Sequence, residues 1–230
     1  MGLNWVKSMG RDTNPDALVA LRGLNALGWN ETQLSMFFRA IAGERNRARA
    51  LADGQQLVWT GPDIDQTRSR DTGVVVREMF REAKRDVLIA TYSYSEKKNA
   101  ELLFGELAAR MDIEPDLRVR MVFGALRRFG ESRRAAVDVY EAFVERFRTN
   151  RLWPGRRIPH VFYYPDALER NAGEACEMHA KCVVIDDETL YLGSANFSYQ
   201  AHHRNIEAGV KLQNPVLARQ LRVEFDSLIA

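Results

Sequence analysis

The chain has 230 residues, 46% of them hydrophobic, and a formal net charge of +2 at pH 7. This length and composition predict a globular protein with one main domain and a modest appendage. The small net charge gives no global sign of nucleic-acid binding. No apolar run approaches the roughly 20 residues of a membrane helix, and the N-terminus has neither a signal-peptide core nor a myristoylation motif. We therefore expect a cytoplasmic protein without a membrane segment.

Residues 1–54 are predicted to form a helical segment. A first helix begins at Pro15, carries leucines at i, i+3 spacing and ends at Gly28. A second helix begins at Asn30, with Gln33 in the position of a capping box. The pair has the shape of a helix-turn-helix motif, but an ordinary helical pair that packs against the main domain is the favoured interpretation.

Helices and strands alternate along residues 55–230, which we assign to one main domain. Strands are predicted at residues 87–92, 119–123 and 161–164, in a hairpin at 182–192, and around Glu207. Amphipathic helices are predicted at residues 74–84, 100–111, 131–147 and 215–228. This order predicts an α/β fold with a mixed, largely parallel sheet that is covered by helices on both faces.

A basic stretch lies between the predicted helix at 131–147 and the strand at 161–164. It combines four arginines with a tryptophan, namely Arg148, Arg151, Trp153, Arg156 and Arg157. If the tryptophan is exposed, these side chains could follow a phosphate backbone and stack on a base. The alternative is the solvated end of a helix, where arginines are favoured by the helix dipole. The pattern supports both interpretations about equally.

The clearest chemical signal is the pattern H-x-K-x-x-x-x-D followed by G-S-x-N, formed by His179, Lys181, Asp186, Ser194 and Asn196. If the segment is a strand, His179 and Lys181 share one face, because residues two apart point the same way. A histidine can act as nucleophile or proton carrier near neutral pH, and a lysine places a positive charge against a phosphate oxygen. We interpret the segment as a phosphate-binding site.

Each of these residues also has an ordinary interpretation. A lone histidine beside an apolar run is more often a core residue than a catalyst, and serine and asparagine commonly form turns. Lys181, however, would be costly to bury without an anionic partner. The joint register of the polar residues therefore favours a functional site. Three other histidines are not part of such a motif and are predicted to lie on the surface or behind the site: His160, His202 and His203.

The two cysteines, Cys176 and Cys182, are predicted to be small buried side chains. A structural disulfide is not expected in a reducing compartment, and the spacing does not fit a zinc site. The sequence therefore predicts no metal site.

The motif resembles the signature of the phospholipase D superfamily, and Glu207 lies in the N-x-E strand that usually completes it. The resemblance implies a phospholipase D-like fold and a phosphodiesterase that uses no metal and no cofactor. It implies that His179 attacks phosphorus to form a phosphohistidine, that Glu207 hydrogen-bonds this histidine, and that Asp186 is largely structural. The phosphate oxygens would be held by Lys181, Ser194 and Asn196.

A single copy of the motif is present, without a second H-x-K. Phosphohistidine chemistry needs a nucleophile on one side of phosphorus and a general acid on the other. Members of the superfamily usually supply these as two motif copies. We therefore expect a homodimer whose two-fold axis brings both His179 side chains to one site.

A finer resemblance rests on residues 57–62, residues 74–83, the single motif and the helical N-terminus. In these features the chain resembles the phospholipase D-like component of bacterial DISARM anti-phage systems. This resemblance implies a bacterial protein encoded beside a helicase and a DNA methyltransferase. It also implies nucleic acid as the natural substrate, with other subunits of the defence system as further partners.

Two classes of function follow. The first is a metal-independent phosphodiesterase, and within it a nuclease acting on DNA is favoured over a phospholipid phosphodiesterase, because the basic arginine-aromatic stretch suits nucleic acid. The second is a non-catalytic module that binds nucleic acid or assembles a defence complex through the phosphate pocket. The sequence leaves open DNA against RNA, strand and sequence preference, and the need for partner proteins.

Overall fold

The computed structural model describes residues 15–62, 70–94, 98–124, 134–149, 152–163 and 178–229. The chain divides into two compact units, residues 1–52 and 53–230. The described part of the first unit consists of helix α1 (Pro15–Ala26) and most of helix α2 (Glu31–Asp53), which ends at the boundary.

Both predicted N-terminal helices are confirmed, together with the capping box between them. The backbone N–H of Asn30 donates to Gln33 Oε1 (2.9 Å), and the N–H of Gln33 donates to Asn30 Oδ1 (3.0 Å). Gly28 ends the turn after α1 with φ of 87°, a conformation that favours glycine. Within this unit, Leu21 and Leu34 are buried.

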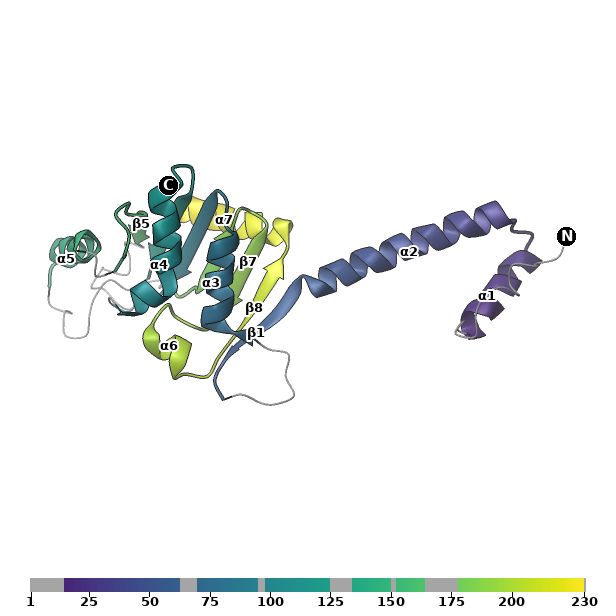
Figure 1. Ribbon diagram of the computed structural model, residues 1–230, viewed down its shortest axis with the longest axis horizontal. Coiled ribbons are helices and arrows are strands. Elements are labelled where there is room, and N and C mark those ends of the chain that lie inside the picture. Colours follow the sequence, from purple (N-terminus) through teal and green to yellow (C-terminus); the bar gives the residue numbers. More distant parts are fainter. Residues whose placement is uncertain are drawn as a thin grey trace. The chain divides into compact units, whose positions relative to one another are not determined.

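In the described part of the chain, the second unit is built on an eight-stranded sheet in the order β2-β1-β8-β7-β6-β3-β4-β5 (Figure 1). In chain order the strands are β1 (Gln55–Thr60), β2 (Arg70–Asp71), β3 (Asp86–Thr91), β4 (Arg118–Phe123), β5 (His160–Tyr163), β6 (Cys182–Ile185), β7 (Thr189–Gly193) and β8 (Glu207–Gln213). The pairs β1/β2, β3/β4 and β4/β5 are parallel. The pairs β1/β8, β7/β8, β6/β7 and β3/β6 are antiparallel. The predicted mixed α/β sheet is confirmed, but the expectation of a largely parallel sheet is wrong for the described strands. The tight β6–β7 hairpin turns the chain back on itself, and β6 and β7 also run antiparallel to their outer neighbours β3 and β8.

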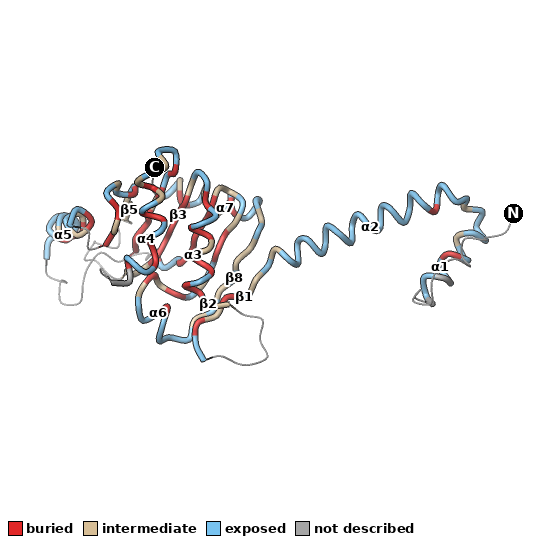
Figure 2. Tube along the Cα trace, viewed as in Figure 1, coloured by how far each residue is buried: buried red, intermediate tan, exposed pale blue. Residues whose placement is uncertain are grey.

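Helices cover both faces of this sheet, as predicted. One face packs against α3 (Thr72–Glu82), α4 (Lys98–Ile113) and α5 (Ala136–Arg148). The other face packs against α7 (Pro215–Ile229) through Ala218 and Phe225. A short helix, α6 (Tyr199–His203), follows β7. Figure 2 shows that buried residues concentrate on the strands and on the helix sides that face them.

Among the described residues, no helix combines the length and the apolar character that would be needed to cross a membrane.

Candidate active site

The polar residues of the motif meet at one end of the adjacent strands β6, β7 and β8. They are His179 and Lys181 before β6, Ser194 and Asn196 after β7, and Glu207 at the start of β8. Backbone hydrogen bonds hold the three segments in register: Gly193 N–H donates to Lys181 O (3.1 Å), and Ser194 N–H donates to Ala208 O (3.0 Å). Residues far apart in the chain thus surround one small area at the end of the sheet.

The side chains of His179 and Lys181 contact each other directly. Lys181 Nζ lies 2.9 Å from His179 Nδ1 and donates to the backbone oxygen of His179 at 2.6 Å. An ammonium group can only donate hydrogen bonds, so Nδ1 accepts in this contact. A neutral imidazole in this arrangement therefore carries its proton on Nε2.

Lys181 is a buried positive charge, with only 7% of the residue exposed. Desolvation by burial lowers the pKa of its ammonium, and the nearby charge of Glu207 opposes that shift. Among the described residues, no carboxylate forms an ion pair with Lys181. A buried cation without a paired anion is costly unless a ligand supplies the negative charge. The surroundings of Lys181 therefore suit an anionic ligand.

Glu207 contacts the G-S-x-N serine instead of the histidine. Its carboxylate accepts hydrogen bonds from Ser194 Oγ and from Asn205 Nδ2, the latter at 2.9 Å. Ser194 Oγ also accepts from Ala208 N–H at 3.1 Å. The hydroxyl proton of Ser194 is thus used by Glu207. Two implications of the family resemblance are absent from this arrangement: a bond from Glu207 to His179, and a Ser194 hydroxyl free to donate to phosphate.

The amide of Asn196 is oriented by the backbone. Asn196 Oδ1 accepts a hydrogen bond from Ser93 N–H at 3.3 Å. Because the amide oxygen is used in this way, the two Nδ2 hydrogens remain available to an anion. Asn196 and Lys181 can thus donate to the same ligand, one through an amide and the other through an ammonium.

Two glycines below the site make room for one tyrosine. Gly193 and Gly209 are directly paired between β7 and β8, and a Cβ at either position would overlap the Tyr191 side chain. Burial raises the pKa of Tyr191 to about 12. The glycine of G-S-x-N is therefore required because the Tyr191 ring lies across it.

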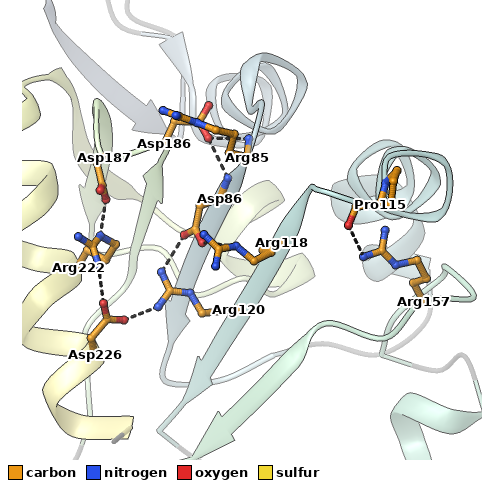
Figure 3. A network of polar contacts seen from close by, with 10 residues as sticks. All are labelled: Arg85, Asp86, Pro115, Arg118, Arg120, Arg157, Asp186, Asp187, Arg222 and Asp226. Atoms are coloured by element: carbon orange, nitrogen blue, oxygen red, sulfur yellow. Dashed lines mark hydrogen bonds and ion pairs between the residues drawn. The ribbon is translucent and has the colours of Figure 1, made fainter.

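Asp186 lies at the other end of β6 and does not contact His179. Its carboxylate accepts hydrogen bonds from the backbone N–H groups of Lys84 (2.7 Å), Arg85 (2.8 Å) and Asp86 (2.8 Å). Figure 3 shows this carboxylate beside the start of β3. These bonds tie the β6–β7 turn to the turn that precedes β3, so Asp186 fixes the hairpin that carries the motif.

A chain of ion pairs next to Asp186 attaches α7 to the sheet (Figure 3). Arg120 on β4 pairs with Asp86 at 2.8 Å and also with Asp226 on α7. Arg222, one turn earlier on α7, pairs with Asp226 at 2.6 Å and with Asp187 in the β6–β7 turn. Arginines and aspartates alternate in this network, which gives it a structural role and little net charge.

The structure adds a residue that the sequence patterns did not single out, Tyr92. It directly follows β3, and its ring centroid lies 4.8 Å from that of His179 and 5.6 Å from Lys181 Nζ. The only local signal was a tyrosine at the end of an apolar strand, which commonly is a core residue. Its place beside the motif follows from the antiparallel pairing of β3 with β6.

The structure contradicts the stacking role of Trp153 in the basic stretch. Trp153 is fully buried in the core, and its Nε1–H donates to Arg157 O at 2.8 Å. Arg157 is also engaged, because its guanidinium donates to the backbone oxygens of Met111 and Glu114. It donates as well to the backbone oxygen of Pro115, the contact that Figure 3 shows. The prediction for Trp153 was wrong because a sequence pattern alone does not tell whether a tryptophan in a polar stretch is exposed to solvent or buried in the core.

The remaining arginines of the stretch differ in exposure. Arg148 ends α5 and is exposed, and the Arg156 side chain is 90% exposed beside Asp112. Arg151 lies outside the described residues. Arg148 and Arg156 are therefore the described members of the stretch whose guanidinium groups face solvent.

Cys182 is buried, and burial raises the pKa of its thiol to about 12. Cys176 lies outside the described residues. Within the described ranges, no three His, Cys, Asp or Glu side chains are grouped closely enough to hold a metal ion.

Comparison with known proteins identifies the class of protein that this fold and site define. A family model described as "Cardiolipin synthase, PLD-like domain" matches residues 76–229, which is more than half of the chain. The chain therefore belongs to the phospholipase D-like family.

A curated relative that is similar to this chain is "DISARM protein DrmC" from Bacillus paralicheniformis. It is 26% identical over 194 residues, which cover 81% of this chain and 67% of the relative.

Two solved structures match this chain over most of their own length. NucT from Helicobacter pylori matches with a TM-score of 0.47 and 16% identity, over 76% of this chain and 95% of that one. The phospholipase D family member Nuc from Salmonella typhimurium matches with a TM-score of 0.46 and 20% identity, over 76% of this chain and 92% of that one.

Proposed function

We propose that this protein is a phosphodiesterase that cleaves DNA, without a metal ion, through a phosphohistidine on His179. The observation that carries the proposal is the buried ammonium of Lys181, which contacts the imidazole of His179 and has no paired carboxylate among the described residues. This arrangement offers a phosphate a positive charge and a nucleophile at the same place.

The first chemical step would transfer the phosphoryl group to the enzyme. Nε2 of His179 attacks phosphorus, so that a P–N bond forms while the P–O bond to the leaving nucleoside breaks. Lys181 and the Nδ2 hydrogens of Asn196 hold the phosphoryl oxygens as charge develops on them. A protonated histidine opposite the nucleophile donates its proton to the departing oxygen.

The second step would release from His179 the other DNA fragment, which then ends in a phosphate monoester. The histidine that has lost its proton now takes one from a water molecule, and the water oxygen attacks phosphorus. The P–N bond breaks, His179 is restored and the general acid is protonated again. Each turnover therefore consumes one water and leaves both histidines as they began.

The first step requires a change in the proton position on His179. In the free arrangement Nδ1 accepts from Lys181, so a neutral ring keeps its proton on Nε2 and cannot attack. A bound phosphate competes for the ammonium and frees Nδ1 to take the proton. Substrate binding would thus prepare the nucleophile.

The second histidine would come from a second copy of the chain in a homodimer. An exposed apolar patch supports this part of the proposal. Leu57, Val210 and Leu192 are direct neighbours across β1, β8 and β7, so they share one face, and their exposed fractions are 53%, 38% and 38%. This apolar patch of Leu57, Leu192 and Val210 lies next to Ala208 and Ser194, two exposed residues at the candidate site. Paired with its own copy, this surface would be covered beside the site that needs a second histidine.

The choice of DNA and the role in anti-phage defence rest on the similarity to the DISARM protein DrmC, at 26% identity. The same similarity supports a cytoplasmic location and partners among other subunits of such a defence system. Exposed Arg148 and Arg156 offer cationic groups for a phosphate backbone.

Two alternatives have observations of their own. The matched family description names cardiolipin synthase, which favours a phospholipid phosphodiester as substrate. The contact of Lys181 Nζ with His179 Nδ1 and the use of the Ser194 hydroxyl by Glu207 favour a non-catalytic module that binds nucleic acid or assembles a complex.

The test uses the full chain in EDTA with single-stranded DNA, double-stranded DNA, RNA and a phospholipid in vesicles. Cleavage of DNA that is lost in His179→Ala and retained in His160→Ala supports the proposal. His160 is a matched control because it is an exposed histidine at the start of β5. Cleavage of phospholipid alone would favour the lipid alternative, and binding of DNA without cleavage would favour the non-catalytic module.

A further inference from the structure

We propose that Tyr92 is a positioning residue that holds the Lys181 ammonium and the His179 imidazole in place. The inference rests on the proposed function, because it concerns how the same site keeps its phosphate-binding groups oriented. The ring of Tyr92 touches both partners: its centroid is 4.8 Å from the imidazole centroid at 55° between planes, and 5.6 Å from Lys181 Nζ.

The backbone on either side of Tyr92 is fixed to the motif. Thr91 Oγ1 donates to Ser93 O at 2.8 Å and accepts from Phe197 N–H at 3.3 Å. Ser93 N–H donates to Asn196 Oδ1 at 3.3 Å, and Tyr94 forms an isolated parallel bridge with Phe197. Because both neighbours are bonded to the segment after β7, the Tyr92 backbone cannot shift without displacing Asn196.

The edge of the ring is also supported by neighbouring backbone. Gly124 follows β4, and a Cβ at this position would lie 3.0 Å from Tyr92 Cδ2 and would overlap the carbonyl oxygen of Met178. Met178 immediately precedes His179. The absence of a side chain at Gly124 therefore allows the β4 end, the Tyr92 ring and the start of the motif to pack closely.

A fixed ring matters most for a lysine. The lysine side chain has four rotatable methylene groups, so its ammonium is poorly located unless its surroundings hold it. A cation over an aromatic face is attracted by the ring quadrupole. In this site the ring and the two acceptors on His179 together surround the ammonium, so that it meets an incoming phosphate in a set position.

The test compares Tyr92→Phe and Tyr92→Leu, each made in the wild-type chain and in Lys181→Ala. Tyr92→Phe keeps the ring and is expected to retain kcat within about 3-fold, whereas Tyr92→Leu is expected to lower kcat by about 10-fold with a smaller change in KM. In the Lys181→Ala background the loss from Tyr92→Leu should be clearly smaller, because residues that act through one another are not additive. Equal losses in the two backgrounds, or loss of activity in Tyr92→Phe, would overturn the proposal.

A second readout separates this inference from the proposed function. Binding of inorganic phosphate is measured for the same variants by calorimetry, which requires no turnover. If the wild type does not cleave any substrate, the proposed function fails, and the role of Tyr92 is judged from phosphate affinity alone. A roughly 10-fold weaker affinity in Tyr92→Leu with retention in Tyr92→Phe supports positioning. An affinity that is the same in all three proteins contradicts it.

Discussion

The Nζ atom of Lys181 lies 2.9 Å from Nδ1 of His179, so the group suited to bind a phosphate already occupies one nitrogen of the proposed nucleophile. A substrate must therefore compete with His179 for the ammonium. This competition links phosphate binding to the release of Nδ1. The two side chains are therefore expected to act as a unit.

Replacement of Lys181 by alanine is expected to lower the rate of DNA cleavage by about 100-fold or more, because a preorganised charge at the reacting oxygens is removed. The rate constant is measured in single-turnover experiments with excess enzyme. Lys211→Ala is the matched control, since Lys211 is a half-buried lysine on β8 that pairs with Glu82. A rate near that of the wild type in Lys181→Ala would show that the lysine is structural.

The proposed homodimer predicts a specific mixing behaviour. Light scattering should give about twice the chain mass of 26.3 kDa. Mixing the wild type with excess His179→Ala should suppress activity beyond simple dilution, because heterodimers hold a single histidine. Leu192→Asp, in the apolar patch, should give inactive monomers. A monomer with full activity would refute the shared site.

The stability of the fold is expected to fall in mild acid because of His202. Only 3% of this residue is exposed. Burial lowers the pKa of His202 to about 4; His203 and Arg77 add to the shift, while Asp71 and the backbone of Asn196 oppose it. The unfolded chain, with a pKa near 6.5, therefore binds the proton first as the pH falls.

From pH 6.5 down to 4, this difference should remove on the order of 3 kcal/mol from the free energy of unfolding. Urea unfolding across this range measures the effect. In His202→Leu the titrating group is absent, so the loss of stability should be smaller by about that amount. Parallel profiles for the two proteins would assign the acid sensitivity to other groups.

The arginines of the basic stretch should separate into two kinds. Joint replacement of Arg148 and Arg156 by alanine should reduce the salt dependence of DNA binding by about one unit of slope for each phosphate group that is no longer neutralised. Arg157→Ala should instead lower stability by about 1–3 kcal/mol, since it leaves backbone carbonyls without donors. Binding across a salt series and urea unfolding distinguish the two effects. An unchanged slope in the double variant would make Arg148 and Arg156 ordinary solvent-exposed side chains.

Much of the architecture could be predicted because it depends on local patterns. The capping box of Asn30 and Gln33 depends on residues three apart, and the α/β alternation depends on hydrophobic periodicity. The proximity of His179, Lys181 and Asn196 could also be predicted from the sequence, because the β6–β7 hairpin returns the chain to the same end of the sheet.

The remainder of the site depends on pairings that a sequence alone does not specify. Tyr92 reaches His179 because β3 pairs with β6 across a long separation in the chain. The sequence motif alone does not specify which donor Glu207 binds. In the structure its carboxylate accepts hydrogen bonds from Ser194 and Asn205, and not from His179. Trp153 packs in the core against Phe104, and Arg157 O accepts a hydrogen bond from its indole N–H.

The most direct test of the central claim is to trap the phosphohistidine. The wild-type chain is mixed in EDTA with a single-stranded DNA oligonucleotide that carries a different dye at each end. The reaction is quenched in alkaline denaturant, and the peptide that contains His179 is examined by mass spectrometry. The proposed mechanism predicts a nucleotide adduct on His179 in the wild type and in His160→Ala, and its absence from His179→Ala. Cleavage that proceeds without an adduct on His179, or that stops in EDTA, would contradict the mechanism.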